Sequence, residues 1–96
     1  MNKYEAMIII KPDLSDEEKK TLFKQIDDAV TKNGGAITQS GVWAERRKLY
    51  FPIKKFMEGV YYLVAFSAAS SAPGEIRNIY KLNENILRVL FTRMDN

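Results

Sequence analysis

Hydrophobic and polar residues alternate near the start of the chain, which predicts a β-strand from residue 3 to residue 10. Side chains of a strand point alternately to its two faces. One face is expected to join a core and holds Tyr4, Ala6, Ile8 and Ile10. The other face holds Lys3, Glu5, Met7 and Ile9.

After residue 15 the apolar residues recur every three to four positions, the spacing of a helix. Ser15 with Glu18 three residues later forms a capping box, which marks a helix start. The stripe expected to face the core consists of Leu22, Ile26, Ala29 and Val30. Asn33-Gly34-Gly35 predicts the helix end, because glycine adopts the left-handed conformation readily.

A long hairpin is predicted next, with an extended segment over 36–53, a turn over 54–58 and a strand over 59–67. Both faces of this third strand are apolar. We expect an inward set of Tyr61, Leu63 and Ala65, and an outward set of Val60, Tyr62, Val64 and Phe66.

A second helix is expected to begin at Ser70-Ser71-Ala72-Pro73, since proline suits a first helical turn. Its apolar stripe is Ile76, Ile79 and Tyr80, and Asn83-Glu84-Asn85 should close it. A final strand over 86–93 would turn Leu87, Val89 and Phe91 inward and Arg88 outward.

The element order is therefore βαββαβ, which predicts an α+β, ferredoxin-like fold. Short crossover connections are right-handed, so both helices should cover one face of a four-stranded antiparallel sheet with strand order 4-1-3-2. Ninety-six residues predict one domain spanning 1–96. The other sheet face would then expose an apolar patch, which favours a protein partner.

Composition argues against several classes of function. The chain has no histidine and no cysteine, which removes imidazole catalysis, thiol chemistry and nearly all zinc sites. No constellation of residues would position a reaction, so we expect no enzyme activity, no cofactor, no metal and no small-molecule substrate. No membrane span or signal peptide is expected either. The absence of cysteine suits a reducing cytosol.

Positive charge is concentrated in one run, residues 46–55. This run holds five of the 15 basic residues, no acid and two aromatics, whereas the whole chain carries a net charge of only +3. Basic patches with interleaved aromatics attract nucleic acids and stack on their bases. The residues predicted to bind RNA are Lys54 and Lys55, joined by Lys3, Arg88 and Arg93, where the first and last strands should pair.

Several segments, in order along the chain, carry a family resemblance. They are residues 3–12, 33–37, 58–62 and 85–89, and above all 43–55, with Trp43, a basic cluster, Leu49 and a Tyr-Phe-Pro-Ile run. Together they resemble bacterial small-subunit ribosomal protein number six over essentially the whole chain. The resemblance implies a structural protein of the ribosome that binds small-subunit (16S-type) ribosomal RNA in the central domain, together with the eighteenth small-subunit protein. The expected location is then a ribosome of the cytoplasm or of an organelle.

The predicted partner surface follows the second strand, which would lie at the sheet edge with free backbone groups. Trp43 either anchors the partner there or packs within the hairpin. The open sheet face is a competing docking site. The candidate residues are Trp43, Arg46, Arg47, Lys48, Val64 and Phe66.

One alternative function stays open, an RRM-like module that binds single-stranded RNA outside the ribosome. Gly59 and the aromatic residues after it match part of the third-strand motif of such modules. Tyr4 lies near the position of the companion aromatic, but its face is predicted to join the core.

Overall fold

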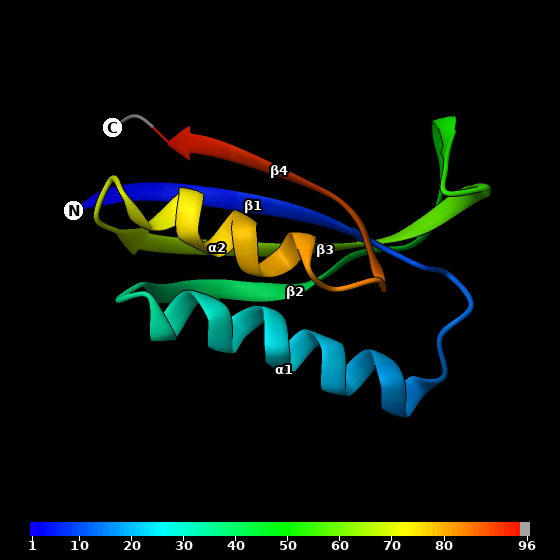
Figure 1. The fold of residues 1–96 in the computed structure, drawn as a ribbon, viewed down its shortest axis with the longest axis horizontal. Coiled ribbons are helices and arrows are strands. Elements are labelled where there is room, and N and C mark those ends of the chain that lie inside the picture. The colour runs from blue at the N-terminus through cyan, green and yellow to red at the C-terminus, as the bar shows by residue number, and fades with distance from the viewer. Residues whose placement is uncertain (95–96) are drawn as a thin grey trace.

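The computed structural model describes residues 1–94 and has the predicted element order and sheet. The elements are β1 (Asn2–Ile10), α1 (Asp16–Lys32), β2 (Ala36–Ile53), β3 (Phe56–Ala68), α2 (Ala72–Lys81) and β4 (Ile86–Met94). All pairings are antiparallel, in the order β2-β3-β1-β4, so β2 and β4 form the edges. Both helices lie on one face of the sheet (Figure 1).

The ends of α1 follow the predicted chemistry. The Glu18 backbone N–H donates to Ser15 Oγ at 3.2 Å, and the Ser15 N–H donates to Glu18 Oε1 at 3.1 Å. The backbone hydrogen bond from Ser15 lowers the pKa of the Glu18 carboxyl. At the other end Gly34 has a φ of 79°. The next residue must also be glycine, because a Cβ on Gly35 would lie 2.9 Å from the backbone oxygen of Val30.

The core lies between the helices and the sheet, and the predicted stripe of α1 is entirely buried in it. The predicted inward set of β1 is buried there as well. In α2, Ile76 and Tyr80 are buried, but Ile79 is 44% exposed, so its predicted core position is wrong. Ile79 lies instead beside the groove between the two helices.

The predicted facing of β3 is wrong. β3 pairs with β1 so that Ile8 lies opposite Tyr62 and Ala6 opposite Val64. Residues opposite each other share a face, so the core face of β1 determines which side of β3 is buried. Val60, Tyr62, Val64 and Phe66 therefore lie in the core at 4% exposure or less, and Tyr61, Leu63 and Ala65 face the open side.

The predicted inward position of Leu87 in β4 is wrong, because the strand contains a bulge. Val89 and Phe91 pack against the core as predicted. The pairing with β1 shifts between Ile9 and Ile10, so that Ile10 lies opposite Ile86. As a result Ile86 belongs to the helix-side core cluster, whereas Leu87 is buried outside it.

The buried hydroxyl of Tyr80 should make the free energy of unfolding depend on pH. Its hydroxyl donates to the Ile26 carbonyl at 2.8 Å, and burial raises its pKa above the ordinary value. The fold thus favours the neutral phenol, and this contribution is full below about pH 10 and declines as the pH rises further. We expect the free energy of unfolding to fall above pH 10 by up to about 1.4 kcal/mol per pH unit from this group.

Urea unfolding at pH 9 and pH 11 checks this expectation. Tyr80→Phe should flatten the alkaline decline, whereas Tyr50→Phe should not, because Tyr50 is fully exposed. Equal slopes in the wild type and Tyr80→Phe would contradict the assignment.

Candidate nucleic-acid interface

The β2–β3 hairpin extends beyond the rest of the sheet (Figure 1). β1 pairs with β3 only as far as Val60, whereas β2 pairs with β3 to the end, where Ile53 lies opposite Phe56. Residues 46–58 therefore form a two-stranded arm, called the hairpin arm below. A two-stranded hairpin has little stability of its own, so its protruding side chains suit contact with another molecule.

The hairpin arm exposes both charge and aromatic surface. Tyr50 is fully exposed, Phe51 is 79% exposed and Met57 is 59% exposed. The five predicted basic residues of the arm are also exposed. The Arg46 Nε lies 3.1 Å from Glu58 Oε2, so one cation of the arm is paired. The arm therefore presents aromatic rings among cations, as the sequence predicted.

The turn of the hairpin arm is tighter than predicted. It consists of Lys54 and Lys55 alone, and β3 already begins at Phe56. The two lysines have φ values of 49° and 74°, the pattern of a type I′ turn. Asn-Gly is the preferred sequence there, and a left-handed residue with a Cβ costs about 1 kcal/mol. Backbone strain is therefore present at the two lysines whose ammonium groups lie at the tip of the hairpin arm.

A second cluster lies where the arm joins the sheet. The rings of Trp43 and Tyr61 are 5.9 Å apart, and the Arg47 guanidinium lies 4.7 Å from the centre of the Trp43 ring and 5.8 Å from that of Tyr61. Trp43 is still 52% exposed. It therefore packs within the hairpin and also presents a large apolar surface to solvent.

Two predicted partner residues cannot reach a partner. Val64 is fully buried and Phe66 is 1% exposed, both on the helix side of the sheet. Arg46, Arg47 and Lys48 remain exposed on β2. The open sheet face is built from other residues, with Tyr61, Leu63 and Leu90 among its apolar side chains.

The predicted basic residues of β1 and β4 do not form one cluster. Lys3 lies opposite Met94, and Arg93 lies opposite Tyr4, at one end of the strands. Arg88 lies opposite Ile9, six residues along β1 and so about 20 Å away. The Arg93 Nη2 donates to Asn2 Oδ1 at 3.0 Å. Lys54 and Arg88, far apart in sequence, line one groove.

Tyr4 is buried at 7% exposure and packs against Phe66 with ring centres 5.6 Å apart. A base therefore has no access to the first-strand aromatic that the RRM-like alternative requires. Its third-strand aromatic, Tyr61, does face the open side of the sheet.

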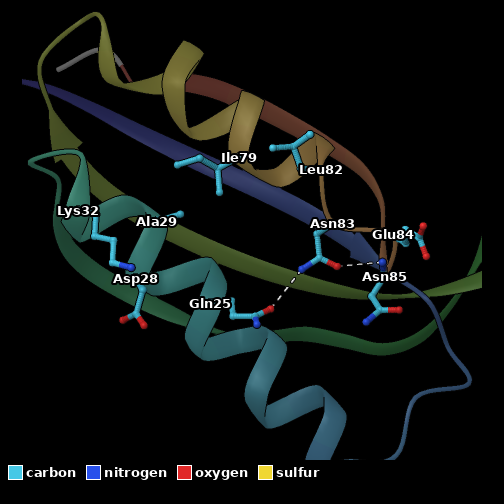
Figure 2. Close-up of a pocket in the computed structure, with 9 residues that line it drawn as sticks. All are labelled: Gln25, Asp28, Ala29, Lys32, Ile79, Leu82, Asn83, Glu84 and Asn85. Atoms are coloured by element: carbon cyan, nitrogen blue, oxygen red, sulfur yellow. Dashed lines mark hydrogen bonds between the residues drawn. The ribbon is translucent and has the colours of Figure 1, made fainter.

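A groove of about 620 Å³ lies between α1 and α2 (Figure 2). The Asn83 Nδ2 donates to Gln25 Oε1 at 3.2 Å, and the Asn85 N–H donates to Asn83 Oδ1 at 3.0 Å. Its charged residues are Asp28, Lys32 and Glu84, of mixed sign. The Asn83 amide thus joins α1 to the loop after α2, and the charges of this groove favour no single sign of ligand.

The described residues hold neither a cluster of metal ligands nor a helix that could span a membrane. Between residues 1 and 94 no three His, Cys, Asp or Glu side chains gather closely enough to hold a metal ion. In the same part of the chain, no helix is long and apolar enough to span a membrane.

Known proteins resemble this chain over nearly its whole length. The sequence model of one family, Ribosomal protein S6, matches residues 3–93. The small ribosomal subunit protein bS6 of Thermoanaerobacter pseudethanolicus is 40% identical over 95 residues, which is 99% of each chain. That of Nitratiruptor is 40% identical and is covered over 70% of its length, against 94% of this chain. The crystal structure of 30S ribosomal protein S6 from Thermotoga maritima has a TM-score of 0.88 and 29% identity, covering 97% of this chain and 87% of its own.

Proposed function

This chain belongs to the ribosomal protein S6 family, and from this premise we propose that it binds small-subunit ribosomal RNA through the hairpin arm. As a member of that family it is a component of the small subunit of the cytoplasmic ribosome. We further propose that it binds the central domain of that RNA together with the eighteenth small-subunit protein.

The strained turn is the observation that carries the RNA proposal. Lys54 and Lys55 adopt left-handed conformations in which Asn and Gly are preferred. Strain of this kind is typical of positions where a side chain serves function rather than stability. Ammonium groups at a protruding tip neutralise phosphates and release counterions, and the exposed Tyr50 and Phe51 nearby are suited to stacking.

Replacing Lys54 by Asn and Lys55 by Gly separates charge from turn geometry. We expect the free energy of unfolding to stay equal or to rise by about 1 kcal/mol, because the turn strain is relieved. We also expect the log–log salt dependence of RNA affinity to flatten by up to about two units, because two phosphate contacts are lost. The measurement is a salt titration with a central-domain transcript, in the presence of the eighteenth protein.

The variant Lys54→Ala with Lys55→Ala is the matched control, since it removes the same charges without improving the turn. Both variants should lose RNA affinity equally while differing in stability. An unchanged salt slope in both would refute the hairpin tip as an RNA contact.

The protein partner is proposed to bind along β2. This strand is an edge of the sheet, so one side of its backbone has N–H and C=O groups that β3 does not use. Trp43 and Arg47 add a half-exposed aromatic and a cation to that edge. Backbone pairing combined with an aromatic anchor is a common way in which a strand edge recognises a partner.

A further inference from the structure

A second groove, of about 460 Å³, lies on the other side of α2 from the groove in Figure 2. Five consecutive residues of β4, Ile86–Leu90, form one wall, and α2 contributes Arg77, Tyr80 and Lys81. The tip of the hairpin arm reaches the same groove through Lys54. Three elements that are distant in the sequence therefore meet at one hollow.

The charge of this groove has a single sign. Its lining includes four cations, Lys54, Arg77, Lys81 and Arg88, and no carboxylate from the described residues 1–94. Within that same range none of the four forms an ion pair, since the ion pair found there joins Arg46 and Glu58. Four cations around one hollow repel one another, which favours an anionic occupant.

Two features position donors in the groove. Arg77 and Lys81 are four residues apart, so they lie on one face of α2, and the Arg77 guanidinium lies 5.3 Å from the centre of the Phe91 ring. β4 is an edge strand, so alternate backbone N–H groups from Leu87 to Leu90 are not used by β1, whereas the Ile86 N–H donates to the Asn83 carbonyl. Cations combined with backbone N–H groups are the donors that bind phosphate oxygens.

We infer that this groove holds a stretch of RNA phosphate backbone, with Arg77 and Lys81 as contacts that add to those of the hairpin tip. The inference rests on the proposed RNA-binding function and extends it to a second surface. An RNA strand is favoured over an acidic protein segment because Lys54 belongs to both surfaces. One strand can therefore pass from the tip into the groove without leaving basic surface.

The test is the double variant Arg77→Gln with Lys81→Gln. If both side chains neutralise phosphates, the log–log salt slope for a central-domain transcript should fall by about two, and affinity at 0.1 M salt should fall roughly 10- to 60-fold. The matched control is Lys20→Gln with Lys24→Gln, which removes the same charge from exposed positions of α1. Binding is measured with the eighteenth protein present, and thermal unfolding confirms that each variant is folded.

Three outcomes would overturn the inference in different ways. If the Arg77 and Lys81 variant binds RNA like its control while the Lys54 and Lys55 variant is weakened, the groove is not an RNA contact and the proposed function stands. If neither variant is weakened, the proposed RNA surface is wrong as well. If the Arg77 and Lys81 variant loses binding to a poly-glutamate peptide but keeps its RNA affinity, the groove receives an acidic protein segment.

Discussion

Replacing Phe66 by Ala should lower the free energy of unfolding by about 3–5 kcal/mol. Phe66 is 1% exposed, lies 5.6 Å from the Tyr4 ring and meets the Phe91 ring edge-on at 6.4 Å. Truncation removes these contacts and leaves a cavity between the sheet and the helices. Urea unfolding at pH 7 measures the loss.

Phe51→Ala is the matched control, because it deletes the same atoms from a side chain that is 79% exposed. Its effect should stay within about 0.5 kcal/mol. If the two substitutions cost the same, Phe66 is not a core residue and the open-face position that the sequence predicted for it would be restored.

The sequence correctly predicted those elements whose pattern of apolar and polar residues is compatible with only one buried face. In α1 the capping box, the apolar stripe and the Gly-Gly exit all agree, and each is present in the structure. β1 places charged residues on one face, so its apolar face had to be the core. From these elements and the rule of right-handed crossovers, the sheet order follows.

The facing of β3 could not be predicted in the same way. Its residues are apolar on both faces, because one face joins the core and the other forms the open side of the sheet. The register between β3 and β1 determines which face of β3 is buried, and the periodicity of the sequence does not specify this register. Tyr4 lies opposite Phe66 and Ile8 opposite Tyr62, so this register places Phe66 and Tyr62 in the core.

The sequence predicted the part of the candidate site whose residues are adjacent, together with Arg88, which lines one groove with Lys54. The basic run in 46–55 was visible as a cluster, and the structure places it on the hairpin arm. Arg77 and Lys81 were not predicted, although their spacing of four on α2 was a usable signal. Their meeting with Lys54 and Arg88 depends on how far the arm reaches, which is a property of the tertiary structure.

Trp43→Ala should weaken the proposed heterodimer by about 30-fold or more, equivalent to at least 2 kcal/mol. Trp43 lies on the edge strand β2, is 52% exposed and is held in place by Tyr61 and Arg47. An aromatic ring that is already ordered loses little entropy on binding, while its exposed half offers area for burial. Isothermal titration of the eighteenth small-subunit protein, without RNA, gives the affinity.

Two further variants determine where the partner binds. Leu82→Ala removes an 85%-exposed apolar side chain next to the groove between the helices, and it should leave the affinity unchanged. Leu90→Asp puts a charge on the open sheet face at a position that is 44% exposed, so the fold should tolerate it. If Trp43→Ala keeps full affinity while Leu90→Asp abolishes binding in a folded chain, the partner docks on the sheet face. Loss with Trp43→Ala alone would instead place the contact at the β2 side of the sheet, where the Trp43 ring packs against Tyr61 next to the free backbone groups of the edge strand.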